Sequence, residues 1–174
     1  MVSTGTVPAN ISASISQVVA IAPESAPVVD PTLQIKADAI DSYFKVRGLP
    51  FASLGMKMVL EAEKNNLDWR LLPAIAMRES TGGKFDCKKA DFNAFGWGSC
   101  KIGFKSHEEA IEVVAKNLGG NNPNTARHYD NKTTMQILRA YNPPSIVKRY
   151  AEQVMAIMDA IGEADKEIII DAKV

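Results

Sequence analysis

Glu79 has the side chain best placed for chemistry. It follows the apolar segment 71–76 and precedes the Ser-Thr-Gly-Gly segment 80–83. If 71–79 is a helix, its end holds this carboxyl rigidly while the side chain projects into a cleft. Apolar surroundings favour the protonated form of a carboxyl, because burial disfavours the charge. A protonated glutamate can donate a proton to a leaving oxygen, as glycosidic cleavage requires. The alternative is a solvated residue at a helix end.

A second segment, residues 93–98, has the sequence Asn-Ala-Phe-Gly-Trp-Gly. Gly96 and Gly98 have no side chain and allow the backbone to approach a ligand closely. Phe95 and Trp97 offer flat apolar faces suited to a sugar ring, and Asn93 offers both a donor and an acceptor. The alternative is a loop whose aromatic side chains fill the core.

A third segment, Ala140-Tyr141-Asn142, lies at the expected end of another helix. A tyrosine hydroxyl can hold a carboxyl in place, and the amide of Asn142 can bond an N-acetyl group or the backbone. Alternatively, Tyr141 packs in the core.

The elements that must position these residues are helices, because apolar residues recur at helical spacing through most of the chain after residue 35. Segment 84–105 has no clear period and predicts a structured loop, with a short hairpin at most. The predicted class is therefore all-α, or α+β at most. Helices are expected over 36–47, 51–65, 69–81, 107–118, 134–141 and 145–161.

Several local signals set the ends of these helices. Asp68 is a plausible N-cap, and Pro73 is expected to cost the following helix one hydrogen bond. Ser106 with Glu109 predicts a capping box. A second capping box is predicted at Thr133, with its partner Gln136 three residues later.

The chain is expected to comprise three parts. Residues 1–34 are rich in Ser, Ala, Val and Pro and contain no Lys or Arg, which predicts a flexible arm or stalk. Alternatively, this segment packs on the domain or on a partner. It lacks the basic and continuous apolar regions of a secretory signal. Residues 35–163 form the expected catalytic domain, and residues 164–174 an expected tail.

Composition excludes several classes of function. Twenty basic and twenty acidic residues give a formal net charge of zero, which argues against nucleic-acid binding. Two Cys and two His at these spacings do not form a zinc pattern, so we expect no metal and no cofactor. The apolar runs fall short of the ~20 residues of a membrane-spanning helix.

The three segments together resemble a known family. Segment 71–80, Leu-Leu-Pro-Ala-Ile-Ala-Met-Arg-Glu-Ser, looks like the catalytic helix of the lysozyme-like superfamily, closest to soluble lytic transglycosylases and bacterial N-acetylglucosaminidases. Segment 93–97 resembles the Asn-x-Phe-Gly loop of the glucosaminidase branch. Segment 140–142, followed by 147–150, resembles the transglycosylase branch. The likeness runs from about 38 to 161 and implies a compact lysozyme-like domain that cleaves the β-1,4 glycan strand of peptidoglycan.

The resemblance implies roles for individual residues. Glu79 is the general acid/base, and Tyr141 orients Glu79 or the substrate beside it. The chain departs from the transglycosylase pattern at 94–97, where a Gly-Leu-Met-Gln segment and its glutamine are missing. The residues expected to contact the sugars are Ser80, Asn93, Phe95, Gly96, Trp97 and Asn142.

The number of acids decides the expected reaction. Two-carboxylate hydrolysis needs a second acid ~5–9.5 Å from the first. Asp86 and Asp91 are only weak candidates, and capping or a solvated face explains Glu108, Glu109 and Glu112 better. We therefore expect a lytic transglycosylase that gives 1,6-anhydro products. The alternatives are a hydrolase (N-acetylglucosaminidase or muramidase), a chitin-acting enzyme and a non-catalytic glycan-binding module.

Cys87 and Cys100 flank the 93–98 segment. A bridge between them would contribute on the order of 3 kcal/mol and preorganise the loop. It would fit an extracytoplasmic location, whereas two free thiols would fit a reducing compartment. The expected partner is peptidoglycan, and the arm suits docking on a secretion apparatus or a virion.

Overall fold

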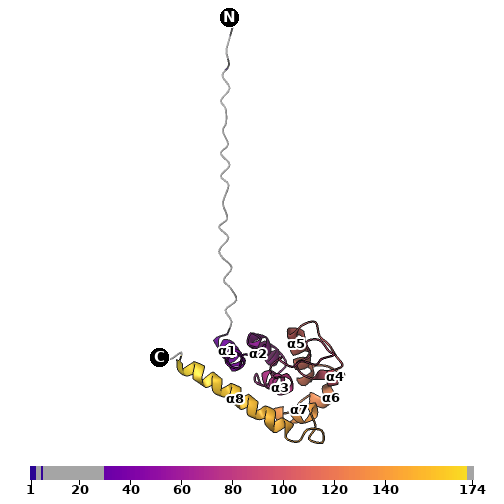
Figure 1. Ribbon diagram of the computed structural model, residues 1–174. Coiled ribbons are helices and arrows are strands. Elements are labelled where there is room, and N and C mark those ends of the chain that lie inside the picture. Colours follow the sequence, from indigo (N-terminus) through magenta and orange to yellow (C-terminus); the bar gives the residue numbers. More distant parts are fainter. Residues whose placement is uncertain (3–4, 6–29, 172–174) are drawn as a thin grey trace.

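The computed structural model describes residues 1–2, 5 and 30–171, with side chains described as far as residue 164. Most of the expected N-terminal arm thus lies outside the described residues. Within the described part every regular element is a helix, which confirms the all-α class (Figure 1). The helices are α1 Pro31–Lys45, α2 Gly55–Lys64, α3 Leu71–Ser80, α4 Trp97–Cys100, α5 His107–Leu118, α6 Ala126–Tyr129, α7 Thr134–Tyr141 and α8 Tyr150–Asp171.

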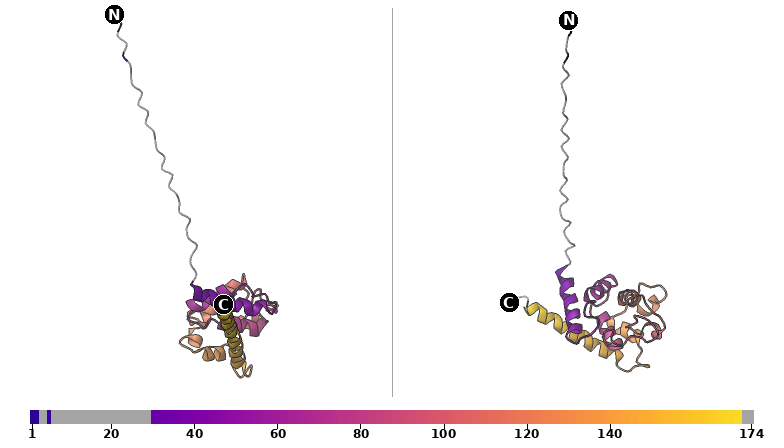
Figure 2. Two further views of the ribbon diagram at one scale, coloured as in Figure 1. Left: turned by 90° about the vertical axis from the view of Figure 1, so that its left-hand side faces the viewer. Right: turned by 45° about the horizontal axis from the view of Figure 1, so that its top comes forward.

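The two outer helices are longer than expected. Helix α1 begins at Pro31, not near 35, because the Asp30 carboxylate accepts a hydrogen bond from Thr32 N at 2.8 Å and a proline at the first position is preset for a helix. Helix α8 begins at Tyr150, not near 145, and continues through residues 164–171, where the sequence suggested a tail. In Figure 2 it forms a long rod along one side of the domain.

Helix α3 lies at the centre of the domain and carries Glu79. It lies between α2 and α8, and both contact it (Figure 1). Every residue from Leu71 to Ala76 is buried, so the helix is enclosed nearly all round. The large buried side chains of Phe44, Phe51 and Ile111 complete the surrounding core. A side chain at the end of such a helix has a rigid support.

The start of α3 differs in detail from the expectation. The helix begins at Leu71, and Arg70 is its N-cap. Asp68 instead accepts a hydrogen bond from Arg70 N at 2.9 Å, in the turn before the helix. Pro73 is therefore the third helical residue, where the backbone N–H has no partner within the helix. The expected loss of a helical hydrogen bond at Pro73 does not occur.

The two predicted capping boxes have different outcomes. The box at Thr133 is confirmed, since both reciprocal hydrogen bonds with Gln136 are present. At α5 the Ser106 hydroxyl accepts from Glu109 N, but the Glu109 carboxylate accepts from Lys105 N. The box at Ser106 is therefore only half formed.

The segment expected to hold a short hairpin contains no strand among its described residues. Residues 84–105 form an irregular loop that includes the one-turn helix α4. Positive φ at Gly96 and at the three consecutive residues 98–100 turns the chain tightly and rules out extended pairing there.

Candidate active site

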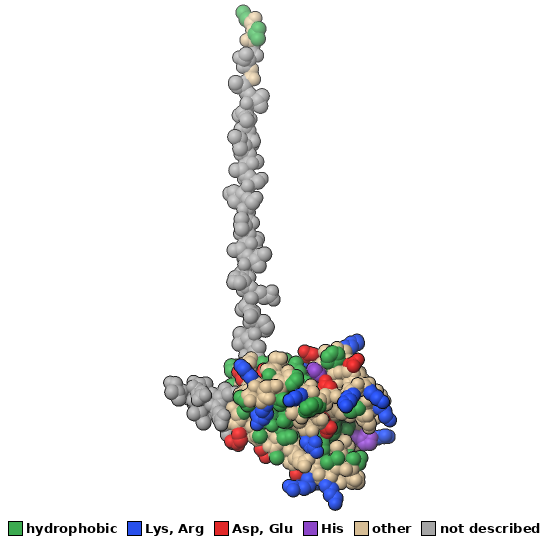
Figure 3. Space-filling model, viewed as in Figure 1, with side chains coloured by type: hydrophobic (Ala, Val, Ile, Leu, Met, Phe, Trp, Pro, Cys, Tyr) green, Lys and Arg blue, Asp and Glu red, His purple; other side chains and the backbone are tan. Residues whose placement is uncertain are grey.

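The end of α3 opens into a cleft of about 490 Å³. Its walls come from the 95–99 loop, the segment around α6, and the end of α7 with the loop that follows. Both acidic and basic side chains are present on the face of the molecule shown in Figure 3. The residues lining the cleft are Glu79, Phe95, Gly96, Trp97, Gly98, Ser99, Thr125, His128, Tyr129, Tyr141, Asn142 and Ile146.

Glu79 is half-buried in the last turn of α3 and is held by a tyrosine from another helix. The Tyr150 hydroxyl donates a hydrogen bond to Glu79 Oε1 at 2.6 Å. The other oxygen, Oε2, faces Gly96: a β-carbon added at Gly96 would lie 3.1 Å from it. One oxygen of the carboxyl is thus anchored, while the other lies against a backbone that has no side chain.

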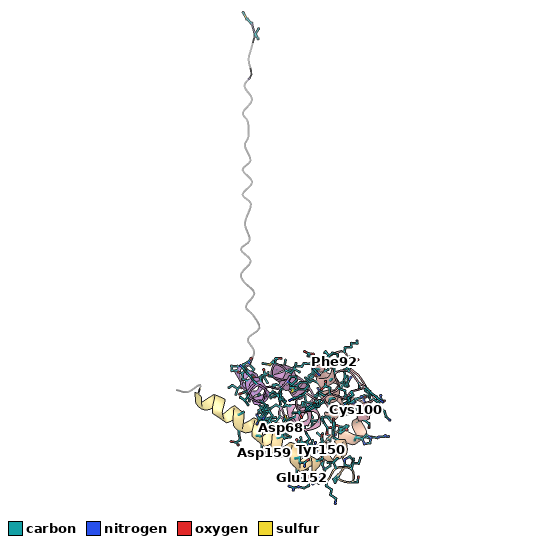
Figure 4. All side chains as sticks on the ribbon, viewed as in Figure 1. Asp68, Phe92, Cys100, Tyr150, Glu152 and Asp159 are labelled. Carbon is teal, nitrogen blue, oxygen red and sulfur yellow. A yellow bond between two sulfur atoms is a disulfide. The ribbon has the colours of Figure 1, made fainter. Side chains whose placement is uncertain are left out.

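Tyr150 is the first residue of α8 and is 2% exposed (Figure 4). Burial raises the pKa of its hydroxyl far above the ordinary range, with further contributions from Tyr141 and Glu79. The hydroxyl therefore stays protonated and acts as a donor. Its ring stacks on that of Tyr141, with centroids 6.0 Å apart, and the Arg78 guanidinium lies 5.8 Å from its centroid.

Sequence reasoning missed this role of Tyr150. Tyr150 has helical spacing with Val154 and Met158, and all three are buried, so it has the pattern of an ordinary core residue. The signal that could have revealed it is the hydroxyl, because a buried tyrosine needs a hydrogen-bond partner.

Tyr141 does not make the hydrogen bond expected of it. Its hydroxyl donates to the Phe95 carbonyl, so the direct hold on Glu79 passes to Tyr150. Burial raises the pKa of Tyr141 well above its ordinary value, and the nearby Glu79 adds to this. Burial also raises the pKa of Tyr129. These three tyrosines, Tyr129, Tyr141 and Tyr150, are called the tyrosine cluster below.

Two of the expected sugar-contacting side chains are bound within the protein instead. Asn93 is 1% exposed; its amide donates to the carbonyls of Trp97 and Ile102 and accepts from Trp97 N, at 2.8–3.0 Å. Ser80 is 2% exposed, donates to the Ala76 carbonyl and accepts from Gly83 N. All the polar atoms of both side chains are used internally. Asn93 and Ser80 therefore shape the loops beside the cleft and do not line it.

Phe95 contributes its backbone to the cleft, since its ring is fully buried against Phe51. Trp97 is half-buried and lines the cleft, with its ring centroid 5.9 Å from that of Tyr141 and 6.4 Å from that of Tyr129. Gly96, with φ of +64°, directs the chain past Glu79. The result is an aromatic wall next to the carboxyl, a surface on which sugar rings can stack.

Asn142 also lines the cleft, as expected. Its Oδ1 is buried and accepts no hydrogen bond from the described residues. An unpaired buried acceptor costs about 1–3 kcal/mol, so this side chain is held there at a cost in stability.

Glu79 is the one carboxylate among the described residues that line the cleft. Asp86 forms a 2.6 Å hydrogen bond with His107, and Asp91 is exposed outside the cleft. Glu112 is 3.4 Å from Lys57 on another face. Within the described part of the chain, no group of three or more His, Cys, Asp or Glu side chains could hold a metal ion.

The expected bridge between Cys87 and Cys100 is confirmed, with their Cα atoms 5.5 Å apart. It encloses the 93–98 segment. Together with the hydrogen bonds of Asn93, it fixes the loop that forms the aromatic wall.

The other walls come from segments that the sequence did not single out. Thr125, His128 and Tyr129 lie between the helices expected over 107–118 and 134–141, and Ile146 lies in the loop before α8. No composition signal distinguishes them, because tertiary packing alone brings them to the cleft.

The chain has no match among protein-family models or among curated proteins. In the described part of the chain, no helix combines the length and apolarity that crossing a bilayer requires.

Proposed function

We propose that this protein cleaves the β-1,4 glycan strand of peptidoglycan, with Glu79 as the general acid/base, as a lytic transglycosylase. The observation that carries the proposal is a single carboxyl fixed by the Tyr150 hydroxyl at 2.6 Å, in a cleft whose described lining contains no second acid. The aromatic wall around Trp97 supports a sugar ligand, because flat apolar rings stack on sugar rings.

One carboxyl can perform both proton transfers of the reaction. Protonated Glu79 donates its proton to the glycosidic oxygen as the bond to the sugar C1 breaks. The resulting carboxylate then accepts the proton of the same sugar's 6-hydroxyl, whose oxygen attacks C1. Glu79 returns to its starting form, no water is consumed, and the product has a 1,6-anhydro ring. Two-acid hydrolysis is the less favoured reaction, since it needs a second carboxyl ~5–9.5 Å away.

Asn142 completes the proposed site. It lines the cleft, and a side-chain amide can form a hydrogen bond with an N-acetyl group. The disulfide supports action in an oxidising, extracytoplasmic compartment, where the glycan strands are found.

The test is zymography of the wild type and Glu79→Gln on purified sacculi. The proposal predicts a clearing band for the wild type and none for the variant, with the same thermal unfolding midpoint. A Glu79→Gln protein with full lytic activity would overturn the assignment. A wild type that binds sacculi without cleaving them would favour a glycan-binding module on the same fold.

A further inference from the structure

The cleft wall formed by residues 125–129 is fixed by an asparagine beneath it. Asn117 on α5 is 3% exposed, and its Oδ1 accepts hydrogen bonds from Thr125 Oγ1 at 2.6 Å and from Asn122 Nδ2 at 2.9 Å. The backbone adds a 2.8 Å bond from Ala126 N to the Asn122 carbonyl. This wall is therefore preorganised in the same way as the opposite loop.

Tyr129 anchors the end of the wall. It is 9% exposed and packs against Trp97, with ring centroids 6.4 Å apart. The two residues before it, Arg127 and His128, are exposed on the same helical turn, and His128 lines the cleft. Arg127 is not itself a lining residue, but its side chain is hydrogen-bonded to that of His128. The backbone of this turn beside the cleft is thus set by buried neighbours.

Arg127 and His128 form a pair that carries donors only. Arg127 Nε donates to His128 Nε2 at 3.0 Å. Because Nε2 accepts, the imidazole proton lies on Nδ1, and the pair presents that N–H together with the remaining guanidinium N–H groups. Such a pair is complementary to an anionic group.

The charge of Arg127 is also unneutralised by the protein. Among the described residues no carboxylate lies within ion-pair distance of Arg127, as is also the case for Arg78 and Arg149. The planar guanidinium matches a carboxylate with two parallel hydrogen bonds.

We propose that Arg127 and His128 bind a carboxylate of the peptide stem carried by the glycan strand, so that the cleft favours stem-bearing strands over bare ones. This inference rests on the proposed function, since the stem reaches the mouth of the cleft only when the glycan lies along it. It assigns this wall a role in substrate selection that is separate from the chemistry at Glu79.

The test compares kcat/KM on soluble glycan chains that keep their stems with kcat/KM on chains whose stems an amidase has removed. The wild type should prefer the stem-bearing chains. Arg127→Gln should lower the ratio of the two values about tenfold, as expected for loss of a charge-assisted hydrogen bond. Arg127→Lys, which keeps the charge, should recover part of the preference. Arg139→Gln removes an exposed arginine outside the cleft and should leave the ratio unchanged.

A ratio for Arg127→Gln within twofold of the wild-type ratio overturns the inference. If the wild type cleaves neither substrate, the proposed function fails, and a binding measurement then decides the inference alone. A stem-bearing disaccharide is titrated against the bare disaccharide, using wild type and Arg127→Gln. Tighter binding of the stem-bearing form by the wild type alone supports the stem site, and equal binding by both proteins refutes it.

Discussion

Removing one hydroxyl, with Tyr150→Phe, tests how the carboxyl of Glu79 is held. The substitution deletes the 2.6 Å hydrogen bond to Glu79 Oε1 and keeps the ring that stacks on Tyr141. A hydrogen bond to a carboxylate contributes about 1.5–3 kcal/mol. If the bond fixes the carboxyl for proton transfer, most of that free energy is lost from the transition state. Since each 1.4 kcal/mol is a factor of ten, we expect kcat to fall roughly 10-fold to 100-fold.

The assay is the initial rate of release of soluble muropeptides from sacculi, measured by chromatography over a range of substrate concentrations. Tyr43→Phe is the matched control, because it makes the same chemical change at a buried ring on α1, away from the cleft. Thermal unfolding of both variants separates positioning from loss of fold. The reasoning is refuted if Tyr150→Phe keeps kcat within twofold of the wild type.

Three further predictions concern the surroundings of Glu79. Gly96→Ala should lower kcat, because its β-carbon would lie 3.1 Å from Glu79 Oε2, and should cost about 1–2 kcal/mol for the left-handed backbone. Gly48→Ala is the control, because Gly48 also has a left-handed backbone, with φ of +61°, but a β-carbon there would have nothing within 4 Å. It should lower the free energy of unfolding in urea by a similar amount without lowering kcat. Equal kcat values for the two variants would contradict the crowding of Glu79 by the added β-carbon. Reducing the disulfide should lower the free energy of unfolding by about 3 kcal/mol and weaken activity. Denaturation curves and initial rates with and without reductant measure both effects. An unchanged free energy of unfolding would contradict a stabilising role of the disulfide. Folding raises the pKa values of the three hydroxyls in the tyrosine cluster. Above about pH 10 these tyrosines therefore ionise in the unfolded chain but not in the folded protein. Their contribution to stability is complete below about pH 10 and is lost as the pH rises above that value. Tyrosinate absorbance against pH, in native and denatured protein, checks this: cluster titration near pH 10 in the native state would refute it.

Local patterns in the sequence predicted most of the framework. The apolar period before Glu79 predicted a buried helix that ends at this residue, and Thr133 with Gln136 predicted the start of α7. The disulfide between Cys87 and Cys100 was also predicted. These features depend on neighbours along the chain, or on two residues that flank one loop.

The parts that failed depend on the folded conformation of a loop or on contacts between helices, which residue spacing does not predict. Asn93 has the chemistry of a sugar ligand, and only the folded loop shows that its amide bonds Trp97 and Ile102. Tyr150 has the spacing of a core residue, and only the crossing of α8 over α3 brings its hydroxyl to Glu79, 71 residues earlier. Residue type thus predicted which side chains could act, while tertiary packing decided which of them do face the cleft.

The most direct test of the central claim is mass spectrometry of the soluble products after sacculi are digested with wild type and with Glu79→Gln. The account predicts products with 1,6-anhydro ends from the wild type and none from the variant. Products that are one water heavier, with reducing ends, would contradict the transglycosylase mechanism. Anhydro products from Glu79→Gln at the wild-type rate would contradict the role of Glu79 itself.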